Sequence, residues 1–220
     1  MLTITFYGHA CFALTDGETK LLIDPFFTGN GLAPIKAEEA ETDYILVTHG
    51  HGDHTGDAAS IAERTGATII TTVDVGTALF GNCRNLICGN IGGKIQLPFG
   101  SIQYVPAIHG SGVPGGVACG FVIRMDGKTV YHMGDTSLTK DFELLADKID
   151  ALLIPIGDFY TMGPEDALTA VEMIRPGYVI PMHFNTFPMI MQDADSFARS
   201  VEEKDFQAQV LNPGEFLVLV

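Results

Sequence analysis

A short stretch near residue 50 concentrates side chains that bind metal ions. It reads His49-Gly50-His51-Gly52-Asp53-His54 and follows the apolar run Tyr44-Ile45-Leu46-Val47. Three imidazoles and one carboxylate within six residues form a ligand density that ordinary surface or core composition rarely produces. Because a strand is expected to end just before this stretch, we predict a tight loop in which Gly50 and Gly52 take positive φ angles. Neighbouring side chains in such a loop point in different directions, so the stretch is predicted to serve two metal ions.

Three more polar residues each come directly after an apolar run. They are His109, Asp135 and His183, which follow residues 105–108, 130–134 and 179–182. Because sheets gather functional groups at the ends of their strands, we expect these side chains to share one site with the first stretch. The combined set holds five imidazoles and two carboxylates. Seven ligands are about what two divalent ions need when one carboxylate and one hydroxide bridge them.

The seven residues divide naturally between two ions. We assign His49, His51 and His109 to the first ion, Asp53, His54 and His183 to the second, and Asp135 to the bridge. Two cations lower the pKa of a shared water, so that hydroxide can attack a carbonyl carbon or a phosphorus atom near neutral pH. Asp53 is also the candidate catalytic group that handles the proton of this water. For any single histidine the competing interpretation is a hydrogen-bonded core or loop side chain.

The elements that must position these residues occur twice in the chain. Residues 12–24 and 120–135 both read as strand, Asp-Gly turn, strand and aspartate, and residues 150–158 repeat the pattern of residues 43–51. Helices are expected over 57–64, 140–148 and from Pro164 to about residue 175, with a short helix or turn over 75–80. We therefore predict one α/β (α+β) domain over 1–220, a four-layer αββα sandwich with similar halves of about 1–110 and 111–220. The alternative is two unrelated domains joined near residues 112–116.

Length, composition and charge restrict the class of protein. The 220 residues are 46% hydrophobic, with a mean hydropathy of +0.24 and a net charge of −15. This charge repels phosphate backbones and anionic membrane surfaces, so neither nucleic acid nor membrane is expected as a partner. No run approaches membrane-spanning length and the N-terminal residues lack a basic start, which favours a cytoplasmic protein with a small-molecule substrate. A homo-oligomer stays possible, since edge strands are expected to be exposed.

The metal-ligand pattern resembles the metallo-β-lactamase superfamily. The H-x-H-x-D-H signature at residues 49–54 is intact, and His109, Asp135 and His183 follow in the order of that family. Flanking motifs resemble its short metal-dependent hydrolases related to L-ascorbate-6-phosphate lactonase; they lie at residues 6–12, 22–25, 131–136, 161–167 and 181–188. The resemblance runs the length of the chain and implies a hydrolase with a binuclear metal centre. Hydrolysis of a sugar lactone is an expectation for the branch.

Four further residues are candidates for supporting roles. His9 resembles a position near the mouth of the site and is predicted either to contact substrate or to be a plain loop histidine. Asp24 is predicted either to orient a ligand imidazole or to cap a turn before Pro25. Thr161 and Asn185 are candidate substrate contacts. The loop at residues 158–162 is the counterpart of the metal loop but carries no histidine, so we expect it to line the pocket.

The function predicted from these patterns is metal-dependent hydrolysis of a small ester, lactone or phosphodiester. Imidazole-rich sites suit zinc, although the carboxylates also admit manganese, iron or nickel. One alternative is a non-hydrolytic module on the same fold that binds or senses metal. Another is a phosphodiesterase that acts on nucleotides. The intact ligand set for two ions favours catalysis, because a structural role needs only one closed tetrahedral ion.

Overall fold

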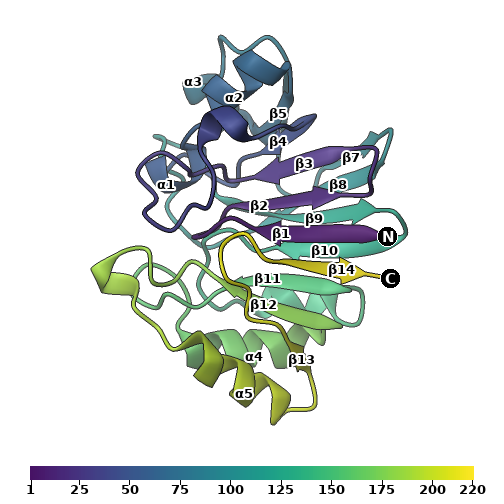
Figure 1. The fold of residues 1–220 in the computed structure, drawn as a ribbon, viewed down its shortest axis with the longest axis vertical. Coiled ribbons are helices and arrows are strands. Elements are labelled where there is room, and N and C mark those ends of the chain that lie inside the picture. The colour runs from purple at the N-terminus through teal and green to yellow at the C-terminus, as the bar shows by residue number, and fades with distance from the viewer.

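Two mixed β-sheets form the centre of the molecule in a computed structural model that describes residues 1–220 (Figure 1). In spatial order the seven strands of the first sheet are β14 (Phe216–Leu219), β1 (Leu2–Phe6), β2 (Phe12–Thr15), β3 (Lys20–Ile23), β4 (Tyr44–Leu46), β5 (Thr68–Thr72) and β6 (Leu86–Gly89). Strands β14 to β3 pair antiparallel, and β3 to β6 pair parallel. The chain thus starts and ends in the same sheet.

The second sheet repeats this arrangement. Its strands are β7 (Lys94–Leu97), β8 (Gly100–Pro106), β9 (Cys119–Met125), β10 (Lys128–His132), β11 (Ala151–Pro155), β12 (Tyr178–Met182) and β13 (Gln207–Ala208). The first four pair antiparallel and the last four pair parallel. The predicted repeat is therefore confirmed at the level of strand order. The sheets divide between β6 and β7, before residue 94, rather than near residue 110, because β7 and β8 belong to the second sheet.

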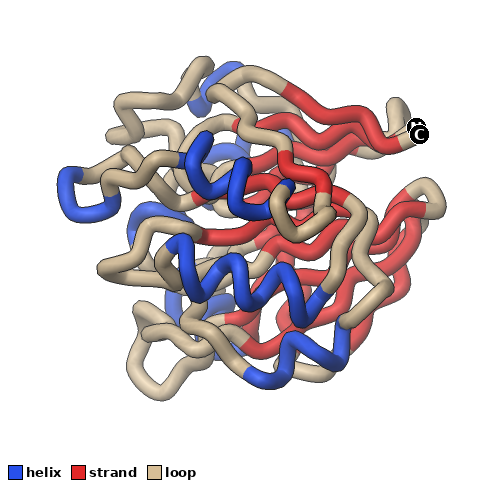
Figure 2. The backbone as a smooth tube through the Cα atoms, turned by 90° about the horizontal axis from the view of Figure 1, so that it is seen from below, coloured by secondary structure: helices blue, strands red, loops and turns tan.

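Helices flank the two sheets and complete four layers, with one pair at the top of Figure 1 and another at its bottom, which lies nearer the viewer in Figure 2. Helices α2 (Ala58–Thr65) and α3 (Val73–Leu79) lie by the first sheet, and α4 (Pro164–Ile174) and α5 (Ala194–Glu202) by the second. The largest buried cluster, of 23 residues, contains side chains of both sheets, such as Phe12 and Phe121. Smaller clusters fill the spaces between each sheet and its helices. This is the predicted αββα sandwich.

Local sequence explains the central elements. Strand β11 is buried at all five positions because it is a parallel strand covered on both faces, and it therefore reads as an unbroken apolar run. Strand β2 alternates between buried and half-buried residues. Helix α4 begins with Pro164, whose missing N–H costs no hydrogen bond there, and ends at Arg175 in the left-handed conformation.

Two expected elements differ from the structure. The helix predicted over residues 140–148 is a shorter 3₁₀ helix, η2 (Lys140–Leu145), which ends before Asp147 with its left-handed φ of 56°. A non-glycine residue with that φ cannot continue a right-handed helix. The ambiguous segment at residues 75–80 is the helix α3.

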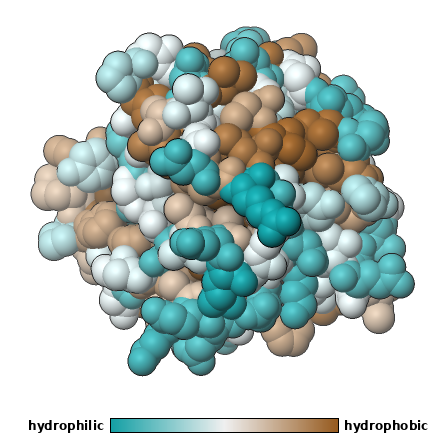
Figure 3. All heavy atoms as spheres, turned by 90° about the horizontal axis from the view of Figure 1, so that it is seen from above, coloured by the Kyte–Doolittle hydropathy of each residue, from teal (hydrophilic) through white to brown (hydrophobic).

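The loops that carry the candidate residues gather at one end of the strands, opposite the chain termini (Figures 1 and 2). Strands β6 and β7 are the free edges of the two sheets. Seen from above, the surface carries a band of hydrophobic residues (Figure 3). Half-buried apolar side chains from this region, including Ile87 and Ile95, pack on the core. No helix has the length and apolar character needed to cross a membrane.

Candidate metal centre

The stretch rich in histidine follows β4 and leads into a single helical turn, α1 (Gly52–Thr55). His49 lies in the loop, His51 caps α1, and Asp53 and His54 lie on its one turn. The predicted positive φ angles of Gly50 and Gly52 are wrong, because neither glycine is left-handed. The loop needs Gly50 for a different reason: a Cβ there would lie 3.0 Å from the Ser111 carbonyl oxygen, to which the Gly50 N–H donates.

Close packing also fixes the end of α1. Gly56 follows the turn with a φ of +32°, and a Cβ there would lie 2.3 Å from the carbonyl oxygen of Pro25. The turn is thus held against the loop after β3, which carries Asp24. Backbone contacts between the two sheets complete the frame, since the His183 N–H donates to the His9 carbonyl at 2.7 Å.

A first group of ring nitrogens converges from two loops. His49 Nε2 lies 2.9 Å from His51 Nδ1, and His109 Nε2 lies 3.3 Å from the same atom. One ligand atom from each of the three residues falls within 4.8 Å of the others. The structure therefore brings together the three histidines that the sequence assigned to one ion.

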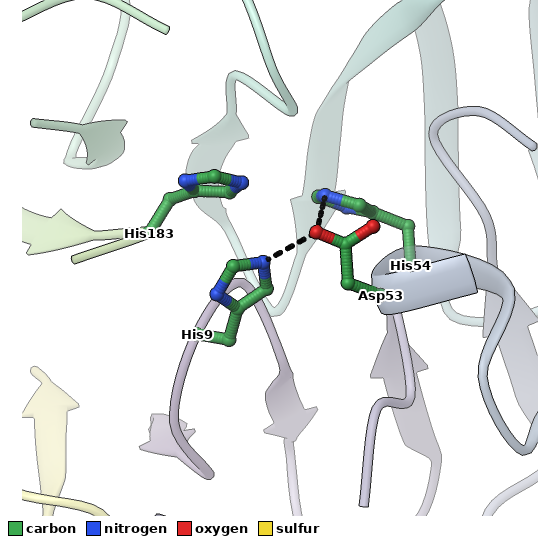
Figure 4. Close-up of side chains that lie close together, drawn as sticks. All are labelled: His9, Asp53, His54 and His183. Carbon is green, nitrogen blue, oxygen red and sulfur yellow. Dashed lines mark hydrogen bonds and ion pairs between the residues drawn. The ribbon is translucent and has the colours of Figure 1, made fainter. Parts of the chain in front are cut away.

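A second group lies beside the first and contains one more residue than expected. Asp53, His54 and His183 are joined by His9, and one ligand atom from each lies within 4.8 Å of the others (Figure 4). His9 Nε2 is 3.1 Å from Asp53 Oδ2, and the His54 Nε2 is 4.0 Å from that oxygen. The rings of His9 and His183 are tilted by 43° to each other, with centroids 4.0 Å apart.

Asp135 lies between the two groups. Its Oδ1 is 3.2 Å from His54 Nε2, and its Oδ2 is 3.1 Å from His183 Nε2 and 3.5 Å from His109 Nε2. His49 Nε2 is 3.9 Å from the same Oδ2. One carboxylate thus faces histidines of both groups, which is the geometry expected of a bridging ligand.

Asp24 and Thr48 hold two of these histidines in one tautomer. Thr48 donates its hydroxyl proton to Asp24 Oδ2 at 2.7 Å, so its oxygen accepts from His49 Nδ1 at 3.0 Å. The Nδ1 of His54 donates to the same carboxylate at 2.7 Å. Each ring thus turns its Nε2 toward the centre, where a cation would replace any proton on that atom. Of the two predicted roles for Asp24, the geometry matches the orientation of a ligand imidazole.

Charge pairing shifts the pKa values in the centre. Although burial opposes it, the carboxylates of Asp135 and Asp24 raise the pKa of His54 well above its ordinary value. Burial likewise opposes ionisation of Asp135, but His54 and His183 hold the pKa of this carboxyl well below its usual range. Burial lowers the pKa of His9 to about 4, so this ring is neutral near pH 7. The centre is therefore built around ionised carboxylates.

Several buried nitrogen and oxygen atoms of the centre are suited to bind a divalent cation. Buried His54 Nε2, Asp135 Oδ1 and both ring nitrogens of His183 have no hydrogen-bond partner in the chain. His54 Nε2 and Asp135 Oδ1 face each other as an ion pair at 3.2 Å. Buried polar atoms are rarely left unpaired, and imidazole and carboxylate are ordinary ligands for zinc and related ions. A cation between them would satisfy these atoms.

The two groups form the floor of an open cavity of about 200 Å³. Its lining residues are His51, Asp53, His109, Asp135, Tyr160, His183 and Phe187. Tyr160 comes from the loop after β11, which confirms the expectation that this loop lines the pocket. A small molecule that enters the cavity reaches both groups of candidate ligands.

Other candidate residues lie away from the cavity lining. His9 is fully buried, with Nδ1 2.9 Å from the Thr186 hydroxyl, and it contacts Asp53 rather than open space. The Thr161 hydroxyl donates to the Met162 carbonyl, and the Asn185 side-chain oxygen accepts from the Gln192 N–H. Both contacts support loops, and neither residue lines the cavity.

Sequence reasoning missed Thr48, Thr186, Tyr160 and Phe187. Thr48 had one available signal, since it separates an apolar run from the first ligand. Tyr160 lies in the loop at residues 158–162, which was expected to line the pocket, but nothing in the sequence singled out its ring. Phe187 had no signal, because only the fold brings its loop to the cavity.

Comparison with known proteins agrees with this arrangement. The family model described as "Beta-lactamase superfamily domain" matches residues 3–183. A UPF0173 metal-dependent hydrolase of Heliobacterium modesticaldum is 49% identical over 100% of this chain and 98% of its own length. Another from Symbiobacterium thermophilum is 51% identical over 99% of this chain and 100% of its own. Among solved structures, Igni18, a metallo hydrolase from Ignicoccus hospitalis, is 36% identical with a TM-score of 0.92, and the match covers 98% of this chain and 97% of that one.

Proposed function

This chain belongs to the UPF0173 family of metal-dependent hydrolases in the metallo-β-lactamase superfamily, and from that premise we propose that it uses two divalent ions to hydrolyse a small ester, lactone or phosphodiester. The observation that carries the proposal is the pair of ligand groups on either side of Asp135. Two groups that share one carboxylate match a binuclear centre better than a single closed site.

The proposal keeps the division of ligands made from the sequence. His49, His51 and His109 would hold the first ion and Asp53, His54 and His183 the second, with Asp135 as the carboxylate shared between the two groups. Zinc is the expected metal because imidazole dominates both groups, and manganese, iron or nickel also suit a centre with two carboxylates. When bound, the ions supply water of lowered pKa and polarise the substrate oxygen.

Asp53 is the residue of this chain best placed to move a proton. It lines the cavity and its side chain is 27% exposed, whereas Asp135 is almost completely buried. A carboxylate that faces both the ligand groups and the open cavity can accept the proton of the attacking water and pass it to the leaving oxygen. His9 fixes the orientation of this carboxylate through the 3.1 Å contact with Oδ2.

The test is turnover that depends on metal. Protein is stripped with a chelator, reloaded with zinc or manganese, and assayed on a panel of simple esters, lactones and phosphodiesters. We expect reloaded protein to hydrolyse at least one class and stripped protein none. Failure of fully loaded protein on the whole panel would overturn the hydrolase proposal and favour a module that binds or senses metal.

A further inference from the structure

Aromatic rings form part of the cavity lining, which we call the aromatic wall. Phe187 and Tyr160 line it, and Phe159 packs edge-on against Tyr160 with ring centroids 4.8 Å apart. Behind Phe187, the ring of Phe26 lies 6.3 Å away, and His9 lies 5.3 Å from Phe187. Phe159 and Tyr160 are 63% and 51% exposed, although large apolar side chains are normally covered. The aromatic wall therefore offers apolar surface to a substrate in the cavity.

The same cavity offers no positive side chain. None of the twelve lysines and arginines of the chain is among its lining residues. Several of them are paired elsewhere, as Arg64 is with Glu41 and Arg175 with Asp147. Metal ions on the cavity floor would serve the reacting group, so a second anionic group on the substrate would find no partner. The net charge of −15 also repels anions that approach.

The size of the cavity limits the apolar group. Its volume is about 200 Å³, and an apolar cavity of roughly 150 Å³ is known to accommodate benzene. There is thus room for about one aromatic ring, and because the cavity is open the rest of a substrate can extend out of it.

Resting on the proposed hydrolase function, we propose that the substrate is an uncharged ester or lactone with one aromatic or similarly compact apolar group, which packs on Phe187 and Tyr160, and without a pendant phosphate or carboxylate. Hydrolysis adds one water across the acyl C–O bond. The water oxygen bonds to the carbonyl carbon, the C–O bond breaks, and the leaving oxygen receives a proton, which yields an acid and an alcohol. A sugar-phosphate lactone does not fit this proposal, because its phosphate would find no lysine or arginine in the cavity lining.

Three methyl esters with the same leaving group test the proposal on metal-loaded protein. They are methyl phenylacetate, methyl 4-carboxyphenylacetate and methyl acetate, followed by proton release. We expect kcat/KM for the neutral aromatic ester to exceed each of the other two by about tenfold or more, as the loss of a well-packed ring or the burial of an unpaired charge implies. Equal rates on all three esters would overturn the proposed substrate class and leave the hydrolase function standing.

Substitutions of Phe187 and Tyr160 test whether these residues cause the preference for the aromatic ester. Phe187→Ala and Tyr160→Ala should each lower kcat/KM for methyl phenylacetate by about tenfold and change the rate on methyl acetate much less. Leu144→Ala removes a side chain that is 72% exposed and does not line the cavity, so it serves as the control. Equal losses on both esters in the wall variants would contradict a specific role in binding the ring.

A binding experiment tests the proposed substrate class independently of hydrolysis. Phenylacetone, a ketone that cannot be hydrolysed, should bind to metal-loaded wild-type protein in calorimetry and bind about tenfold more weakly to Phe187→Ala. Its 4-carboxy derivative should bind more weakly than phenylacetone to the wild type. If phenylacetone binds in this way while no ester is cleaved, the hydrolase proposal fails and the apolar site stands. If the ketone and its carboxylate bind equally, the apolar site is refuted.

Discussion

The loop after β4 and the loop after β11 occupy equivalent places in the two halves but contribute different chemistry. The first carries His49, His51 and the start of α1, and it supplies ligands to both groups. The second carries no histidine and places Tyr160 in the cavity wall. The same strand, loop and helix frame thus provides metal contacts on one side and apolar contacts on the other. Duplication of a frame does not require duplication of its site.

The two hairpins show the same divergence through a difference in spacing. Asp24 follows β3 immediately, whereas Asp135 comes after Met133 and Gly134, which extend the chain beyond β10. The longer connection lets Asp135 reach the centre between the ligand groups, and Asp24 stays behind and hydrogen-bonds His54. One aspartate faces the ions and its counterpart orients their ligands.

Replacing the central aspartate should have the largest effect. In Asp135→Ala both ligand groups lose the carboxylate they share, so kcat/KM should fall by more than the roughly 10–100-fold typical of an orienting residue. Steady-state kinetics on the best substrate of the panel measures this. Activity within tenfold of the wild type would refute the bridging role.

Replacing Asp24, the counterpart of Asp135 in the first half, should have a smaller effect. In Asp24→Asn the side chain keeps its shape but loses the charge that pairs with His54, and metal affinity should fall by about 10–100-fold. Titration with zinc against a competing chelator gives the affinity, and Thr48→Val serves as the matched variant that removes only the hydroxyl link. If Asp24→Asn proved as damaging as Asp135→Ala, the two carboxylates would not have separate roles.

His9 and His109 form a third pair, because each lies in the loop that leads into the first strand of a hairpin, from β1 to β2 and from β8 to β9. His109 is expected to bind metal, and His9 to orient Asp53. In His9→Asn, which tolerates the left-handed φ of 58°, kcat should fall by about tenfold while both ions stay bound. Loss of one ion from this variant would instead make His9 a metal ligand.

Acid should destabilise the metal-free protein through His9. Burial lowers the pKa of His9 to about 4 from an unfolded value near 6.5, so between these values the unfolded chain binds the extra proton. Stability supplied by the neutral ring is therefore lost as pH falls from 6.5 to 4. The Tm of metal-free wild type should fall relative to His9→Asn over this interval. A difference in Tm that is independent of pH would contradict the neutral state of His9.

Sequence patterns were sufficient for the fold and for the convergence of seven residues, because strand periodicity and the repeated strand order place polar residues at one end of both sheets. They were insufficient where contacts between distant segments determine a backbone conformation or the orientation of a side chain. The conformation of Gly50 depends on Ser111, which is distant in the sequence, and the orientation of His49 depends on a threonine hydroxyl that has no spacing signature. The aromatic wall depends on two loops whose proximity only the assembled sheets establish.

Metal content per chain tests the central claim most directly. Protein purified without chelator is analysed for bound elements as wild type and as Asp135→Ala, with Leu144→Ala as a folded control. We predict close to two divalent ions per chain in the wild type and the control, and a clear loss in Asp135→Ala. One ion or none in the wild type, with no change in Asp135→Ala, would contradict a binuclear centre bridged by this aspartate.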